Sequence, residues 1–194
     1  MQTDIQTAKA TMRKQIRNLL QKISPAAHAT LSAQLGDRLQ VQAIWKNAGP
    51  VLFFAPLPDE PDLWPLLAGT LAAGKIATLP RFDPASQSYA AGRVQNLRSD
   101  IVPGQFGIRE PADSCAEIPL SRLDLILVPG VAFDLQGHRL GRGRGYYDRL
   151  LAGIGGVKCG IAFDEQVVNN VPAGPSDMLV DFILTPTRSV EIAD

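Results

Sequence analysis

A strand–helix–strand unit in residues 51–79 limits the folds open to this chain more than any other feature of its sequence. The apolar run at residues 51–55 lies between proline-containing turns, which is typical of a buried strand. Asp62 can cap a helix after it, and a second apolar run at residues 76–79 is closed by Pro80. Such a unit normally forms two parallel strands joined by a right-handed crossover, so we expect a parallel sheet.

Further helices and strands extend this unit along the chain. Apolar residues at helical spacing predict an amphipathic helix over residues 4–22, and Ser24 caps a second helix. A stretch rich in proline and glycine at residues 102–111 is expected to be an ordered loop. More strands are expected at residues 88–94, 123–128, 157–163 and 181–184, the last of which ends the sheet. We therefore predict an α/β fold in a single domain of residues 1–194, with an open, mostly parallel sheet, helices on both faces and the N-terminal helices packed on it.

The balance of charge excludes some classes of partner. Acidic and basic residues number 19 each, so the formal net charge is zero, whereas a general nucleic-acid or anionic-membrane binder carries a basic excess. Cys115 and Cys159 lie far apart, and with two histidines they lack the spacing of a zinc site. The polar start and the absence of a long apolar run predict a cytoplasmic protein. We expect it to be a monomer or weak dimer that binds neither nucleic acid nor membrane.

A glycine-rich stretch follows the expected strand at residues 123–128. Gly141, Gly143 and Gly145 alternate with Arg142 and Arg144, and two tyrosines and a carboxylate follow directly. The spacing differs from that of a dinucleotide fingerprint or a P-loop, and a bare GxGxG is usually a surface turn. Arginines and backbone N–H groups at the start of a helix are, however, what a phosphate group needs. The whole pattern therefore favours a phosphate site.

Several candidate residues also have a purely structural interpretation. Lys9 and Arg13 lie four residues apart on the first helix, where spacing alone predicts a solvated basic face. Glu60 follows a strand and could accept from an amine or amide, although composition favours a surface acid. Asp148 lies in the first turn of the last expected helix, where it either stabilises the helix dipole, by ~0.3–1 kcal/mol, or binds magnesium. Spacing does not separate the two roles.

The position of these residues relative to the strands adds a second argument. In an open parallel sheet, ligands bind beyond the carboxyl ends of the strands. Candidate ligand-binding residues are therefore those that follow the strands: residues 56–60, Arg81, residues 129–148 and residues 163–177. The carboxylates whose role stays open in the last stretch and just beyond it are Asp164, Asp177 and Asp181.

A long block in the middle of the chain resembles a known family. Residues 128–134, VPGVAFD, followed by Gly137 and by residues 139–148, RLGRGRGYYD, are similar to the signature of the 5-formyltetrahydrofolate cyclo-ligases. This block is highly specific. Weaker matches occur in the family's order at Lys9 with Arg13, at residues 57–62, 103–108 and 160–166, and from Val171-Pro172 through Asp177 to Asp181.

The resemblance implies an α/β fold and a reaction that depends on ATP and Mg²⁺. In that reaction 5-formyltetrahydrofolate is cyclised to 5,10-methenyltetrahydrofolate, and ADP and phosphate are released. The formyl oxygen attacks the γ-phosphate, N10 then adds to the activated carbon, and phosphate leaves. The protein must mainly align two substrates and neutralise charge.

The resemblance also implies roles for residues at matching positions. Arg142 and Tyr146 would be catalytic, and Asp148 and Asp177 would hold magnesium. The residues implied to contact ATP are Lys9, Arg13, Arg139, Leu140, Gly141, Arg142, Gly143, Arg144, Gly145, Tyr146 and Tyr147. Those implied to contact the folate are Ala55, Glu60, Phe106, Arg142, Gly143, Arg144, Gly145 and Tyr146. Glu60 would accept from the pterin ring, and Phe106 would stack on the folate.

Two alternatives to this function remain. An enzyme acting on a sugar phosphate or a CoA ester, on a related α/β fold, would use the arginine loop without ATP. A non-catalytic module that binds folate is suggested by Gly174 and Ser176, which depart from the family's pattern.

Overall fold

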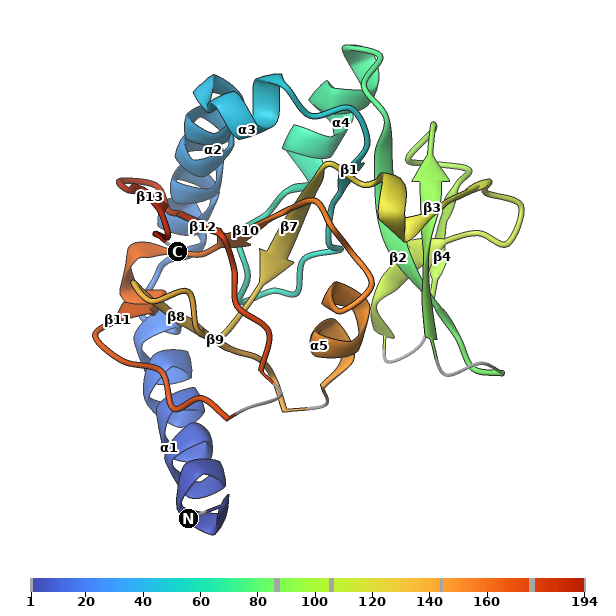
Figure 1. Ribbon diagram of the computed structural model, residues 1–194. Coiled ribbons are helices and arrows are strands. Elements are labelled where there is room, and N and C mark those ends of the chain that lie inside the picture. Colours follow the sequence, from blue (N-terminus) through green and yellow to red (C-terminus); the bar gives the residue numbers. More distant parts are fainter. Residues whose placement is uncertain (1, 86–87, 105–106, 144, 175–176, 194) are drawn as a thin grey trace.

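A large sheet runs through the centre of the computed structural model, which describes residues 2–85, 88–104, 107–143, 145–174 and 177–193 (Figure 1). For Gln2, Thr3 and Tyr146 the description covers the backbone alone. In these residues the sheet has eight strands, in the order β13 (Ser189–Glu191), β12 (Phe182–Leu184), β10 (Val157–Ile161), β7 (Leu125–Pro129), β1 (Val51–Leu52), β2 (Ala77–Asp83), β3 (Ser88–Val94) and β6 (Glu117–Ile118). The strands from β12 to β2 are parallel, whereas β13 at one edge and β3 and β6 toward the other pair with their neighbours in antiparallel fashion. The predicted α/β fold with a mostly parallel sheet is confirmed.

Alternate residues of β7 face different helical layers. Leu125 and Leu127 pack with α2 (Pro25–Val41), α3 (Ala43–Lys46) and α4 (Trp64–Ala72), whereas Ile126 and Val128 pack with α5 (Tyr146–Leu151). These side chains are fully buried, because a strand covered on both faces needs apolar residues at every position. Helices therefore lie on both faces of the sheet.

The starts of α2 and α4 follow from local sequence. Ser24 accepts a hydrogen bond from the Ala27 N–H over 3.2 Å, and Pro25 occupies the first turn of α2. The Asp62 carboxylate accepts from the Trp64 N–H over 3.0 Å, which fixes the start of α4. The predicted start of the helix at Ser24 and Pro25 is confirmed, whereas the N-cap of α4 is Leu63, so Asp62 lies one residue before the cap position expected for it.

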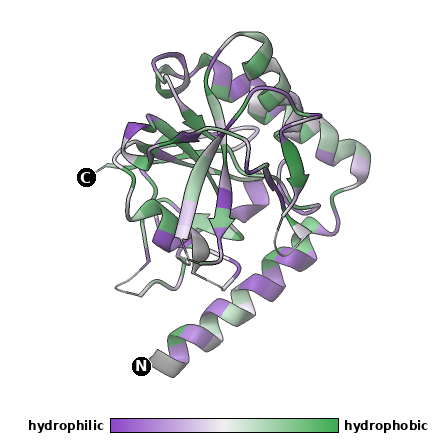
Figure 2. Ribbon diagram, turned by 90° about the vertical axis from the view of Figure 1, so that its right-hand side faces the viewer, coloured by the Kyte–Doolittle hydropathy of each residue, from purple (hydrophilic) through white to green (hydrophobic). Residues whose placement is uncertain are grey.

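A small second sheet carries the N-terminal helix. Strands β8 (Ala132–Asp134), β9 (Arg139–Leu140) and β11 (Val167–Val168) form this sheet, and α1 (Gln2–Leu20) buries Ile16 and Leu20 in the apolar cluster around it. The N-terminal end of α1 projects beyond the sheets and is mostly hydrophilic (Figures 1 and 2). The sequence did not predict this sheet, because strands of two or three residues carry no readable periodicity.

Three other predictions about the strands were wrong. Strand β2 is not closed by Pro80 but continues to Asp83, because Pro80 lies past the end of the β1 ladder, where a missing N–H is tolerated. The expected loop at residues 102–111 contains the antiparallel pair β4 (Ile101–Pro103) and β5 (Arg109–Pro111). The sheet ends with β13 and not with the strand at residues 181–184.

The described residues also contain the short 3-10 helices η2 (Leu120–Arg122) and η3 (Asp164–Gln166). Across the described ranges, every helix falls short of the length and apolarity that a membrane crossing requires.

Candidate active site

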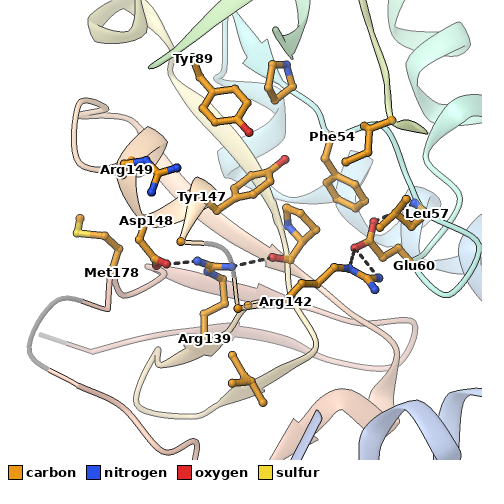
Figure 3. A pocket seen from close by; sticks show the side chains of 18 of the residues that line it. Phe54, Leu57, Glu60, Tyr89, Arg139, Arg142, Tyr147, Asp148, Arg149 and Met178 are labelled. Carbon is orange, nitrogen blue, oxygen red and sulfur yellow. Dashed lines mark hydrogen bonds and ion pairs between the residues drawn. The ribbon is translucent and has the colours of Figure 1, made fainter. Parts of the chain in front are cut away.

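A cleft of about 730 Å³ opens at the carboxyl ends of β1 and β7 (Figure 3). Phe54 and Ala55, just after β1, and Pro129 and Gly130, at the end of β7, are among the residues that line it. The position agrees with the expectation that ligands bind beyond the carboxyl ends of parallel strands.

The cleft collects most of the site residues that the sequence suggested. Those that line it are Lys9, Arg13, Ala55, Glu60, Arg139, Leu140, Gly141, Arg142, Gly143, Gly145, Tyr147, Asp148 and Asp177. Phe106, Arg144 and Ser176 lie outside the described residues, as does the side chain of Tyr146. Segments that are distant in sequence, from α1 to the loop before β12, thus meet around one space.

Arg139 lines the cleft just before the glycine-rich loop. It is 5% exposed, and its Nη2 donates to Oδ1 of Asp148 over 2.7 Å. The guanidinium carbon also lies 5.8 Å from the centre of the Tyr147 ring, and Nη1 donates to the Pro129 carbonyl over 3.4 Å. A buried cation needs such partners, so Asp148 does more here than stabilise a helix dipole.

Lys9 on α1 reaches across the cleft to the loop before β12. Its ammonium donates to Oδ2 of Asp177, which also accepts from the Gly174 N–H over 2.7 Å. Burial raises the pKa of Asp177, but the hydrogen bonds and the positive charge of Lys9 outweigh it and hold the pKa below its usual value. Lys9 is itself buried at 8% exposure, so spacing alone misled when it indicated a solvated face.

Arg13 ties α1 to the glycine-rich loop. Its Nε donates to the Gly141 carbonyl over 2.8 Å. Gly143 adopts φ +98°, and a Cβ there would lie 3.4 Å from the Arg13 guanidinium carbon. Glycine is therefore favoured at this position for its backbone conformation, and a Cβ there would be in ordinary contact with the arginine.

Glu60 is a buried carboxylate on the opposite side of the cleft. Its Oε1 accepts from Nε and Nη2 of Arg142, over 3.0 and 2.9 Å, and its Oε2 accepts from the Leu57 N–H over 2.9 Å. Nη2 of Arg142 also pairs with Asp59. Burial raises the pKa of Glu60, and Arg142 opposes the rise. With a side-chain exposure of 7%, Glu60 is not the surface acid that composition favoured.

Tyr147 supplies a hydroxyl group to the same space. Burial raises the pKa of this phenol, the nearby charge of Glu60 raises it further, and Arg139 opposes the rise. The group therefore stays protonated and able to donate a hydrogen bond. The hydroxyl of Tyr89, on β3, points into the same part of the cleft (Figure 3).

The sequence of the chain that forms this cleft matches a known protein family. Residues 5–186 match the model of the 5-formyltetrahydrofolate cyclo-ligase family. The chain belongs to that family. Its match to the 5-formyltetrahydrofolate cyclo-ligase of Escherichia coli (strain K12) is 31% identical over 177 residues, 89% of this chain and 97% of that protein. The match to the cyclo-ligase of Mus musculus is 26% identical and covers 93% of this chain and 94% of the mouse protein.

Solved structures of relatives have the same fold. The 5,10-methenyltetrahydrofolate synthetase of Aquifex aeolicus is 33% identical, with a TM-score of 0.87, over 96% of this chain and 93% of that one. A synthetase of the same kind from Mycoplasma pneumoniae, at 20% identity and a TM-score of 0.72, supports the fold alone. Membership of the cyclo-ligase family confirms the predictions that the chain is an enzyme and an ATP-dependent ligase.

Some residues that line the cleft were not predicted. They include Gln6, Phe54, Tyr89, Arg149 and Met178. Arg149 could have been suggested by its place beside Asp148. Tyr89 gave no signal, because the antiparallel turn from β2 to β3 that brings it to the cleft was not predicted.

Three charged candidate residues do not line the cleft. Arg81 pairs with Glu117, Asp164 accepts from the hydroxyls of Thr185 and Thr187, and Asp181 accepts from the Lys158 N–H over 2.7 Å. Each therefore has a structural role outside the cleft.

Proposed function

We propose that this protein cyclises 5-formyltetrahydrofolate to 5,10-methenyltetrahydrofolate with ATP and Mg²⁺, and releases ADP and phosphate. One observation carries the proposal: a single cleft holds the buried carboxylate of Glu60 opposite the cations Lys9, Arg13 and Arg139. An acceptor for a ring with several N–H groups and a set of donors for phosphates are thus close enough for two substrates to meet. The family membership of the chain supports the same reaction.

The cationic side of the cleft suits the phosphates of ATP. Lys9 and Arg13 would contact them from α1, and residues 139–147 from below. Arg13 already lies against Gly143, where the backbone is open to a close approach. Guanidinium groups and free N–H groups of a glycine-rich loop bind phosphate oxygens well.

The opposite side suits the folate. Glu60 would accept from the amino group and ring N–H of the pterin, because an ionised carboxylate offers two acceptor oxygens. Phe54 and Ala55 give this side an apolar wall. Phe106 keeps its proposed stacking role, and the glycine-loop residues 142–146 would lie between the two substrates.

Asp148 and Asp177 fit a magnesium ion in their chemistry. Both line the cleft, Arg139 binds Oδ1 of Asp148, and Lys9 binds Oδ2 of Asp177, so one oxygen of each carboxylate is left without a hydrogen bond among the described residues. In the same residues no group of three acidic, histidine or cysteine side chains could hold a metal alone. Mg²⁺ commonly takes one or two carboxylates and completes its ligands with phosphates and water. When bound, the ion would neutralise phosphate charge.

The side chains around the cleft would carry the reaction mainly by placement and charge. Arg142 would bind the transferring phosphate, and Tyr146 would act beside it. The protonated hydroxyl of Tyr147 would donate to an oxygen that gains negative charge. Burial of the site would exclude water from the activated formyl group.

The experiment is incubation of the folded protein with 5-formyltetrahydrofolate and MgATP. We expect methenyl absorbance and ADP to appear together, and neither to appear without ATP. Tight folate binding without turnover would support the non-catalytic alternative. Stabilisation against heat by a sugar phosphate but not by MgATP would support the other.

The remaining expectations are part of the same proposal. The protein would act as one domain of residues 1–194, in the cytoplasm, as a monomer or weak dimer without nucleic-acid or membrane partners. Sedimentation of the purified protein over a range of concentrations measures the state of association.

A further inference from the structure

Arg142 is held by two neighbouring acids, Asp59 and Glu60, which we call the acidic pair. Its Nη2 donates to both carboxylates, and its Nε donates to Glu60 over 3.0 Å. Figure 3 shows the guanidinium directed to Glu60, whereas Arg139 is directed the other way, to Asp148. The arginine that the proposed function assigns to the transferring phosphate is therefore bound on the opposite side of the cleft.

The carboxylate of Glu60 already accepts three hydrogen bonds, two of them on Oε1. Oε1 accepts both N–H groups of Arg142, and Oε2 accepts the Leu57 N–H over 2.9 Å. Each carboxylate oxygen has about two acceptor positions. A ligand that presents N–H groups to Oε1 must therefore compete with Arg142 for the same lone pairs.

The loop that carries Glu60 is the fixed partner in this competition. The Glu60 carbonyl lies 2.9 Å from Nε2 of His28, and the Asp62 N–H donates to the Ser32 hydroxyl over 3.0 Å, so α2 anchors the loop in two places. Arg142, in contrast, lies between two glycines, Gly141 and Gly143. The arginine is therefore the group that moves.

Burial makes the exchange of partners concerted. The Glu60 side chain is 7% exposed, and a buried carboxylate that loses its partner is strongly disfavoured. Arg142 would thus leave Glu60 only as other donors arrive. Asp59, at 37% side-chain exposure, lies outside the lining of the cleft and holds Arg142 from the solvent side.

We infer that Asp59 is a positioning residue, which together with Glu60 keeps Arg142 away from the phosphates until a folate takes its place on Glu60. This inference rests on the proposed function. It requires that the two substrates bind with positive coupling, since folate releases the arginine that ATP needs. By thermodynamic linkage, ATP must raise the affinity for folate by the same factor.

The test is titration calorimetry with Mg²⁺ and a non-hydrolysable ATP analogue, with and without saturating 5-formyltetrahydrofolate. In the unaltered protein, folate should tighten binding of the analogue by about fivefold or more. Asp59→Asn should bind the analogue about 2- to 5-fold more tightly without folate, as expected on loss of a partly exposed ion pair, and should show weaker coupling. Asp59→Glu should restore the coupling.

A matched control is Asp113→Asn, because Asp113 is fully exposed and lies outside the cleft. This variant should behave as the unaltered protein. Binding of both ligands without coupling, or full coupling in Asp59→Asn, would overturn the inference and leave the proposed function standing. Failure of the folded, unaltered protein to bind either ligand would overturn both.

Discussion

Arg139 and Asp148 close the glycine-rich loop at its base, through a hydrogen bond of 2.7 Å between Nη2 and Oδ1. Arg139 comes from β9, just before the loop, and Asp148 from the first turn of α5, just after it. The residues on either side of residues 141–145 are thus joined at the cleft. This ion pair fixes the two ends of the loop relative to each other.

Asp148→Asn should destabilise the protein because it leaves Arg139 buried without its counter-charge. We expect a loss of about 1–3 kcal/mol in the free energy of unfolding in urea, as for other buried groups that lose a charged partner. The loss should disappear when Arg139→Met is added, since the cation is then gone. An equal loss in both backgrounds would show that the ion pair does not contribute. If Asp148 also binds magnesium, Asp148→Asn should need more Mg²⁺ for activity.

Lys9→Met should make the free energy of unfolding less dependent on pH in the acidic range. The pKa of Asp177 is held down in the folded protein by Lys9 and stays near ~3.9 in the unfolded chain. The stability that the pair provides is therefore complete at a pH above the pKa of Asp177 in the unfolded chain. It is lost as the pH falls through the pKa of Asp177 in the folded protein. Urea unfolding from pH 7 down to pH 3 should show a gap between the two proteins that narrows below about pH 4.

The control for this prediction is Lys14→Met, an exposed lysine on the same helix. Its free energy of unfolding should follow that of the unaltered protein at every pH. A gap for Lys9→Met that stays constant with pH would mean that the lysine stabilises the fold by packing alone.

Arg142→Ala should lower kcat by about 10²-fold or more, because the side chain is proposed to neutralise charge that develops on the transferring phosphate. Arg122→Ala, at an exposed position outside the cleft, should leave kcat unchanged. Steady-state rates with both substrates saturating make the comparison. A nearly normal kcat for Arg142→Ala would place this arginine outside the reaction.

Gly143→Ala should weaken nucleotide binding and cost about 1–2 kcal/mol in stability, because φ +98° strains any residue with a Cβ. The added methyl group would also lie in contact with Arg13, on the side of the loop that faces the cleft. Gly155→Ala is the matched control, since a Cβ there meets no atom within 4 Å. Equal nucleotide affinity in the two variants, measured by calorimetry, would contradict the role given to the loop.

The large sheet could be predicted because its strands are either long or fully apolar. The apolar run around Leu125 is typical of a buried strand, and turn residues mark the ends of the unit from β1 to β2. The small sheet could not be predicted, since Arg139 and Leu140 form a strand of two residues that pairing alone defines. Pro80 was wrongly predicted to end its strand, because proline interrupts a strand only where the neighbouring strand requires a backbone N–H donor at that position.

The members of the site could be predicted better than their partners. The spacing of Lys9 and Arg13 predicted a solvated basic face. Only the resemblance to a family predicted that Lys9 contacts the nucleotide. Asp59 received no role, because its contact with Arg142 joins segments more than eighty residues apart and leaves no local pattern in the sequence. Long-range ion pairs of this kind become visible only when the fold is known.

The most direct test of the proposed reaction follows the formyl oxygen. If this oxygen attacks the γ-phosphate and leaves with it, 5-formyltetrahydrofolate labelled with oxygen-18 in the formyl group should yield labelled inorganic phosphate. Mass spectrometry of the phosphate from a single turnover should find one labelled oxygen for each methenyl group formed. Unlabelled phosphate, released together with methenyltetrahydrofolate, would contradict the proposed activation of the formyl group by ATP.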